Sequence, residues 1–179
     1  MGLPRIAING FGRIGRTITR IAKLRRHFDI VAINDLAAPE ALYYAFKYDS
    51  VHGKYPGTLT LEGRTMSIDG DPFQILGEKD PSRLPWKDLG VDYVIESTGQ
   101  FRRLADLEHH IEAGARRVLV TVPTKDDLES TVVLGVNDHE YDADKHHVIS
   151  NASCTTNCLA PVAKVLNDNW GIESGFMTT

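Results

Sequence analysis

Apolar runs and helical patterns alternate along the first part of the chain. Arg5–Asn9 is a β-rich run that stops at Gly10, and from Ile14 to Arg26 apolar residues recur at helical spacing. Asp29–Asp35 is a second, almost continuously apolar run, as expected for a parallel strand that is covered on both faces. The pattern therefore predicts a strand, a helix and a second strand over residues 1–35.

The alternation continues to residue 150, with one interruption. Residues 50–76 contain several glycines between short runs of alternating apolar and polar residues, which indicates small antiparallel strands. Helices are expected over Pro39–Tyr48 and Leu104–Ala113. Further strands are expected at Val91–Glu96, Arg117–Thr121, Thr131–Leu134 and His147–Ser150. We therefore predict an α/β fold, a doubly wound (Rossmann) and mostly parallel sheet with a small antiparallel insertion.

Composition and charge limit which partners and which cellular compartment we expect. The net charge is -4 and no long run of like charge occurs, so we expect no nucleic-acid partner. Because no apolar stretch approaches membrane-spanning length and residues 1–20 lack a signal-peptide pattern, we expect no membrane partner. The chain has two cysteines, four positions apart, and no disulfide framework, which favours a cytoplasmic protein.

A glycine motif lies between the first predicted strand and helix. Gly10, Gly12 and Gly15 follow Asn9 in a G-x-G-x-x-G pattern, and Asp35 ends the second strand. The first glycine permits a tight turn, the second a close approach of a pyrophosphate, and the third close helix packing. A carboxylate at this place accepts from ribose hydroxyls and repels the extra phosphate of NADP, so the pattern favours NAD. The alternative is that the glycines only form turns.

Two further polar segments follow predicted strands. Ser97, Thr98 and Gly99 come after Val91–Glu96, and Thr121 ends the next strand. Doubly wound sheets bind ligands at the carboxyl ends of their strands. These residues are therefore candidates for the cofactor site, although each taken alone is more often a plain loop residue.

A candidate nucleophile lies near the end of the chain. Cys154 follows a strand-like run and precedes a helical pattern over Thr155–Val165, and a helix start favours the reactive thiolate. Ser153 and Thr155 offer hydroxyls for a substrate or phosphate group. Burial of Cys154 or Cys158 in the core is the competing explanation. We expect no metal site, because two cysteines at this spacing lack further ligands in a recognisable pattern.

Two histidine pairs could supply a base for the thiol. We expect His109-His110 and His146-His147 to lie on solvated surfaces, and their spacing assigns none of them to Cys154.

The motifs together resemble a known family. The matching segments occur in order: residues 8–16 (INGFGRIGR), 33–35 (IND), 48–53 (YDSVHG), 96–99 (ESTG) and 150–161 (SNASCTTNCLAP). The chain is similar to the amino-terminal half of phosphorylating glyceraldehyde-3-phosphate dehydrogenases from Arg5 to its last residue. The resemblance implies an NAD-binding domain over residues 1–152 and the start of a truncated α+β catalytic domain over residues 153–179.

The resemblance also implies a reaction and its residues. Cys154 would attack glyceraldehyde 3-phosphate to form a thiohemiacetal, hydride would pass to NAD, and inorganic phosphate would cleave the resulting thioester to 1,3-bisphosphoglycerate. Ser153 and Thr155 would flank the substrate and phosphate site, and the family is homotetrameric. Its matching positions imply NAD contacts by Arg13, Ile14, Asp35, Lys79 and Thr121.

Departures from the family pattern leave alternatives open. In the family, the histidine that serves as base follows almost directly after the motif matched here by Gly175–Thr179. This chain stops just short of that histidine, so we expect an impaired fragment. We also expect residues 153–179 to have little to pack against. Erythrose-4-phosphate dehydrogenase is a rival, which tends towards Glu and Cys where this chain has Asp35 and the Ser97-Thr98-Gly99 segment. A non-catalytic NAD-binding or interaction module is the rival from another class.

Overall fold

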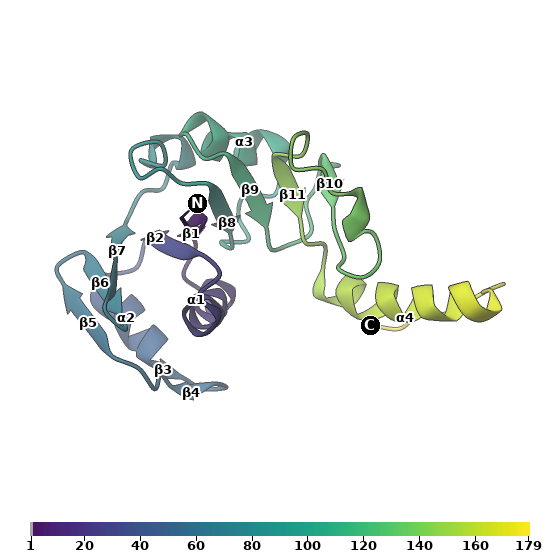
Figure 1. The fold of residues 1–179 in the computed structure, drawn as a ribbon, viewed down its shortest axis with the longest axis horizontal. Coiled ribbons are helices and arrows are strands. Elements are labelled where there is room, and N and C mark those ends of the chain that lie inside the picture. The colour runs from purple at the N-terminus through teal and green to yellow at the C-terminus, as the bar shows by residue number, and fades with distance from the viewer. Residues whose placement is uncertain (1) are drawn as a thin grey trace.

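Nine strands form a single twisted sheet in the described part of the chain, residues 2–179 of a computed structural model (Figure 1). Their order across the sheet is β10-β11-β9-β8-β1-β2-β7-β6-β5. The bounds are β1 Arg5–Asn9, β2 Asp29–Asn34, β5 Leu59–Glu62, β6 Thr65–Ile68, β7 Asp71–Leu76, β8 Tyr93–Glu96, β9 Arg117–Val120, β10 Ser130–Thr131 and β11 Val148–Ser150.

Most of the sheet is parallel. All neighbouring strands from β10 to β7 pair in parallel, whereas β5 and β6 add to the β7 edge in antiparallel pairing. A separate antiparallel pair is formed by β3 (Tyr48–Asp49) and β4 (Gly53–Lys54). The predicted doubly wound α/β fold with an antiparallel insertion is confirmed, and β7 joins the insertion to the main sheet by pairing with β2.

Helices cover both faces of the sheet. The helices α1 (Arg13–Arg25) and α2 (Pro39–Lys47) lie on one side, and α3 (Leu104–Glu112) lies on the other (Figure 1). Ile6 and Ile8 of β1 pack in the cluster on the α1 and α2 side, while Ala7 packs with Trp86 on the opposite face. Alternate residues of β1 are therefore buried on opposite faces, as a doubly covered parallel strand requires.

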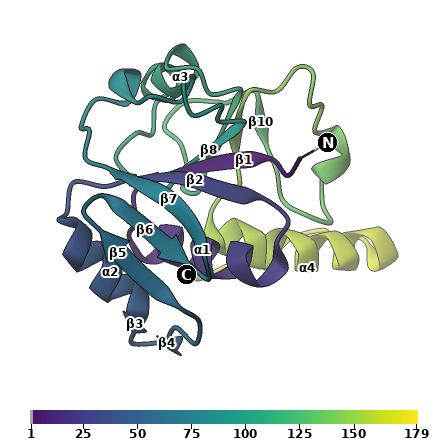
Figure 2. The same ribbon diagram turned by 60° about the vertical axis from the view of Figure 1, so that its left-hand side comes forward.

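The last helix lies apart from this core. The helix α4 (Cys154–Trp170) extends away from the sheet, as both ribbon views show (Figures 1 and 2). Within the described residues, none of those in α4 is buried, and large apolar side chains such as Leu166 and Trp170 are exposed. Residues 171–177 line an open groove together with α4, and Phe176 there is 97% exposed.

One predicted strand is shorter than expected. The apolar run Thr131–Leu134 predicts a strand, but β10 contains only Ser130 and Thr131. The side-chain oxygen of Asn137 accepts from the backbone N–H of Val133 at 2.8 Å, and its amide donates to the carbonyl of Thr131 at 2.9 Å. Asn137 therefore closes a turn that ends the pairing, an effect of a polar side chain that hydrophobicity alone does not register.

The beginning of β11 is attached to the preceding loop by Glu129. Its carboxylate accepts from the backbone N–H groups of His147 and Val148. Partial burial acts to raise the pKa of Glu129, but these two donors outweigh it and hold the pKa below its ordinary value. The carboxylate therefore stabilises the folded chain above the ordinary glutamate pKa, and this contribution is lost as the pH falls through the lower, folded-state pKa.

We expect Glu129→Gln to lower the free energy of unfolding at pH 7 by less than about 1 kcal/mol, since the carboxylate is partly solvated. The difference from wild type should shrink as the pH falls below about 4. Urea unfolding followed by circular dichroism across this range measures it, with Glu62→Gln on the exposed part of β5 as control. A difference independent of pH would contradict the assignment to the carboxylate charge.

Candidate functional site

A cleft of about 440 Å³ opens at the carboxyl ends of β1, β2 and β8. The chain runs from β1 to β2 in one direction across the sheet and later returns to β8 on the other side of β1. Such a switch point is where open α/β sheets bind ligands. The cleft is lined by Asn9, Gly10, Gly12, Asn34, Asp35, Leu36, Glu78, Lys79, Ser97, Thr98, Gln100 and Phe101.

The glycine turn between β1 and α1 is packed on one side and open on the other. Gly10 has φ +94°, and a Cβ there would come within 2.7 Å of the Thr98 nitrogen. A Cβ on Gly15 would come within 2.2 Å of the Gly10 oxygen, so this glycine allows α1 to approach the turn. At Gly12 nothing lies within 4 Å of the same position. The turn thus leaves space for a ligand at Gly12 alone.

Gly12 is also the N-cap of α1, and no side chain caps this helix start. Uncapped N–H groups at a helix start bind anions such as phosphate. The geometry at Gly12 therefore combines free donors with open space, which is what a pyrophosphate needs.

Asp35 presents a fixed carboxylate to the same cleft. One of its oxygens accepts from the backbone N–H of Phe11 at 2.7 Å, and the other accepts from that of Ala37 at 3.0 Å. Each oxygen keeps acceptor capacity beyond these bonds. Asp35 can therefore accept hydroxyl groups of a ligand that extends from the glycine turn.

The residues predicted for the cofactor site fall into two groups. Those that line the cleft are Asn9, Gly10, Gly12, Asp35, Lys79, Ser97 and Thr98. Outside its lining, Arg13 and Ile14 occupy the exposed first turn of α1, and Gly15 packs as described. Gly99 has φ +72° in the turn after β8, and Thr121 donates its hydroxyl to the carbonyl oxygen of Glu96 at 3.1 Å.

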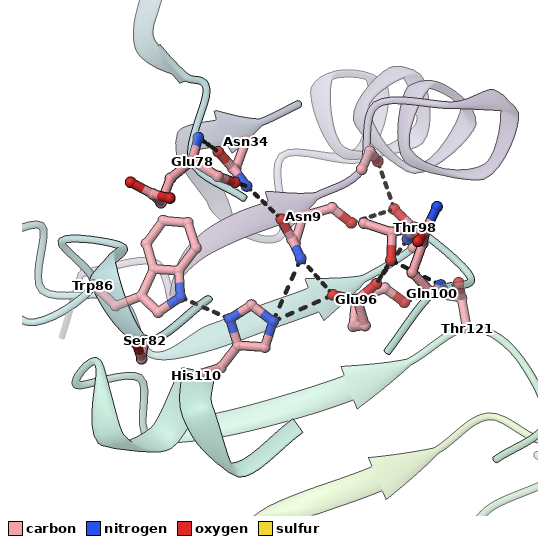
Figure 3. Close-up of polar contacts among 12 residues, drawn as sticks. Asn9, Asn34, Glu78, Ser82, Trp86, Glu96, Thr98, Gln100, His110 and Thr121 are labelled. Carbon is pink, nitrogen blue, oxygen red and sulfur yellow. Dashed lines mark hydrogen bonds and ion pairs between the residues drawn. The ribbon is translucent and has the colours of Figure 1, made fainter. Parts of the chain in front are cut away.

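A buried polar network lies behind the cleft, and the sequence interpretation missed it (Figure 3). Glu96 and His110 are fully buried, and Asn9 is 1% exposed. The Glu96 carboxylate accepts from the Asn9 amide at 2.5 Å and lies 3.2 Å from Nε2 of His110. Its other oxygen accepts from both the backbone N–H and the hydroxyl of Thr98, at 2.8 and 2.5 Å.

The expectation that the pair His109-His110 is solvated was wrong for His110. His109 lies at the surface with Glu112, whereas His110 faces the sheet beside Leu107. The spacing of three between Leu107 and His110 places both on one helix face, which is the signal that could have located the buried histidine. Polar residues at the ends of β1 and β8 then provide its partners.

The thiol site lies at the start of α4, after β11. Cys154 is the first residue of this helix, and Ser153 caps it by accepting from the Thr156 N–H at 2.9 Å. The Ser153 hydroxyl is also 2.9 Å from that of Thr155. The Asn157 amide donates to the carbonyl oxygens of Asn151 and Ser153, at 2.8 and 2.9 Å, and so fastens the first turn to the end of β11.

Both cysteines are exposed in the described chain, so neither fills its core. The residue before the cap, Ala152, has φ +57°, a conformation that costs a non-glycine residue roughly 1 kcal/mol or more. The turn from β11 into α4 is thus sharp, and it leaves the Cys154 thiol at the same edge of the sheet as the cleft. Among residues 2–179, no side chain forms a hydrogen bond with this thiol.

Two segments of the chain match models of known protein domains. Residues 4–104 match the model described as "Glyceraldehyde 3-phosphate dehydrogenase, NAD binding domain", and residues 153–179 match that of the C-terminal domain of the same family. The first match alone covers more than half of the chain. The chain belongs to the glyceraldehyde 3-phosphate dehydrogenase family.

Curated members of the family are similar along nearly the whole chain. Glyceraldehyde-3-phosphate dehydrogenase of Ogataea parapolymorpha is 51% identical over 97% of this chain and 51% of its own length. The enzymes so named from Priestia megaterium and Chlamydia pneumoniae are 50% and 52% identical, each over 98% of this chain and 52% of their own length. The chain therefore spans about half the length of these dehydrogenases, and this half includes the NAD-binding domain of the family.

Residues 2–179 contain neither of two other kinds of site. No helix there is long and apolar enough to cross a membrane. No group of three or more His, Cys, Asp or Glu side chains in this part of the chain is placed to hold a metal ion.

The contact between the glycine turn and the turn after β8 can be tested by mutation. We expect Gly10→Ala to lower the free energy of unfolding by more than about 2 kcal/mol, because both the positive φ and the Thr98 backbone oppose a Cβ. Gly63→Ala is the matched control, since Gly63 also has a positive φ but open surroundings, and it should cost only about 1 kcal/mol. Equal costs in chemical denaturation would contradict the close packing at Gly10.

Proposed function

We propose that this chain binds NAD in the cleft at the ends of β1, β2 and β8, and that Cys154 is the nucleophile of an NAD-dependent aldehyde oxidation. The observation that carries the proposal is the open backbone at Gly12, which faces the same cleft as the fixed carboxylate of Asp35. Membership of the family supports the choice of cofactor.

The residues present fit a dinucleotide. The uncapped start of α1 would hold the pyrophosphate, and Asp35 would accept the hydroxyls of a ribose. Ser97 and Thr98, after β8, and Lys79, after β7, would contact the cofactor from opposite walls of the cleft. Arg13 and Ile14 would contact it from the first turn of α1. Gly15, Gly99 and Thr121 would act by shaping the turns around the site. Bound NAD would supply the acceptor of a hydride.

The thiol chemistry proposed for the whole enzyme begins at Cys154. Its sulfur adds to the aldehyde carbon of glyceraldehyde 3-phosphate and forms a thiohemiacetal. Loss of a hydride to the cofactor and of the hydroxyl proton to solvent or a base leaves a thioester. Inorganic phosphate attacks the thioester carbon, which releases 1,3-bisphosphoglycerate and restores the thiol. The curated relatives carry the name of this glycolytic activity, which supports the substrate.

Substrate binding is proposed for the residues around the thiol. The Ser153 and Thr155 hydroxyls lie 2.9 Å apart at the start of α4, where Ser153 also accepts from the Thr156 N–H. They can donate to phosphate or hydroxyl groups of a substrate held next to Cys154. Because no side chain of residues 2–179 hydrogen-bonds to the thiol, we propose that this chain binds NAD more effectively than it turns over substrate.

Cofactor binding is tested by Gly12→Ala. A methyl group there would occupy the space left for the pyrophosphate without touching the protein, so we expect NAD affinity to fall at least about tenfold with unchanged stability. Isothermal titration calorimetry measures the affinity, and Gly175→Ala, which also adds a methyl group in open space, is the control. NADP should bind more weakly than NAD to the wild-type chain, because Asp35 repels its extra phosphate. Unaltered NAD binding by Gly12→Ala would contradict this placement.

The role of the thiol is tested by comparing Cys154→Ser with Cys158→Ser. With glyceraldehyde 3-phosphate, phosphate and NAD, we expect NADH formation at a rate about 10² to 10⁴ times below that of a full-length relative, since no side chain of residues 2–179 hydrogen-bonds to the thiol as a base would. Cys154→Ser should abolish this residual rate and Cys158→Ser should retain it. Absorbance of NADH in a stopped-flow instrument measures both. Residual activity that survives Cys154→Ser would contradict the assignment of the nucleophile.

A further inference from the structure

The buried network behind the cleft has a fixed direction of hydrogen bonding, which begins at Trp86. The indole Nε1 of Trp86 lies 3.0 Å from Nδ1 of His110. An indole N–H can only donate, so Nδ1 of His110 must accept. The imidazole proton is then on Nε2, which lies 3.2 Å from Oε2 of Glu96 and donates to it. Trp86 therefore holds His110 as the neutral tautomer that supports Glu96.

Donor and acceptor roles are fixed in the same way for the polar side chains at the ends of β1 and β2. Because the Glu96 carboxylate only accepts, the Asn9 amide must turn its NH₂ group to Glu96 and its oxygen to Asn34. The Asn34 amide donates to that oxygen at 2.7 Å, and its own oxygen accepts from the backbone N–H of Glu78 at 2.9 Å. The donor at Trp86 and the acceptor at Glu96 together determine the side-chain orientations in the network (Figure 3). The 3.5 Å contact between the Asn9 amide nitrogen and Nε2 of His110 then joins two donors and is not a hydrogen bond.

The network reaches the cleft at two places, Thr98 and Glu78. Glu96 accepts from the N–H and hydroxyl of Thr98, which lines the cleft and packs against Gly10. Asn34 holds Glu78, the residue next to Lys79, on the other wall. His110 itself is absent from the cleft lining and is fully buried.

We propose that His110 is a positioning residue for cofactor binding: from behind the cleft it fixes the Glu96 carboxylate and, through it, the Thr98 turn. The inference rests on the proposed binding of NAD. Without the Nε2–H donor, one Glu96 oxygen loses a partner in a site closed to water, and the carboxylate is free to move toward its remaining donors. The conformation of Thr98 then varies, and the free-energy cost of ordering it lowers the affinity for NAD.

The experiment compares three variants of the full 179-residue chain by calorimetric titration with NAD, at a temperature where circular dichroism shows each to be folded. His110→Leu removes donor and acceptor, and we expect an affinity about tenfold lower. His110→Gln retains one donor and one acceptor, and should restore the affinity to within about threefold of wild type. His109→Leu makes the same change at the exposed neighbour and should leave the affinity unchanged.

The outcomes separate the positioning role from packing and from the proposed function. Wild-type affinity in His110→Leu would overturn the inference and leave NAD binding standing. Equal losses in His110→Leu and His110→Gln would also overturn it, because the shape of the ring and not its hydrogen bonds would then matter. A wild-type chain that does not bind NAD would remove the proposed function, and the inference with it.

A second measurement decides the matter if His110→Leu does not fold. Nitrogen-15 spectra of the wild-type chain should show His110 with an unprotonated Nδ1 and a protonated Nε2. Trp86→Phe removes the indole N–H and keeps an aromatic ring, so the single tautomer should be lost and NAD affinity should fall by about threefold. Retention of both the tautomer and the affinity in Trp86→Phe would overturn the inference.

Discussion

The Glu96 carboxylate is the acceptor on which the cleft side of the sheet depends. A carboxylate removed from water is costly unless donors satisfy its oxygens, and here the donors come from Asn9 of β1, His110 of α3 and the Thr98 turn. Asn9 lies 87 residues before Glu96 in the sequence, whereas Thr98 and His110 follow it by 2 and 14 residues. The requirement to satisfy one buried group therefore fixes how a strand, a helix and a loop sit relative to one another.

The glycine turn after β1 is also positioned by Glu96, through its contact with Thr98. Thr98 is held between Glu96, to which it donates twice, and Gly10, whose missing Cβ allows the contact. The Ser97 hydroxyl adds a bond to the Gly10 carbonyl oxygen at 2.6 Å. The turns after β1 and β8 thus form one unit. Gly10 and Gly15 pack against the protein, whereas Gly12 between them stays open.

Local patterns in the sequence were sufficient for the elements but not for all their contacts. The first strand, helix and strand, the glycine turn and the place of Asp35 follow from periodicity and turn chemistry, which act within a few residues. The pairing of β7 with β2 does not, because Gln74 pairs with Ala32, 42 residues earlier, and the β7 sequence alternates apolar and polar residues as an antiparallel strand does. His110 was misplaced since a polar residue on an amphipathic helix is normally exposed, and only its partners in β1 and β8 reverse this preference.

Among residues 2–179, the helix α4 is attached to the sheet only at its first turn. The helix spans about 25 Å, yet its tie to the sheet consists of the Ser153 cap and the bonds of Asn157 to residues 151 and 153. The free energy of local opening should therefore decrease from the first turn toward Trp170, and amide hydrogen exchange should accelerate in the same direction. Cys154 lies at the protected end. Fraying of the distal turns can proceed without disordering the reactive sulfur.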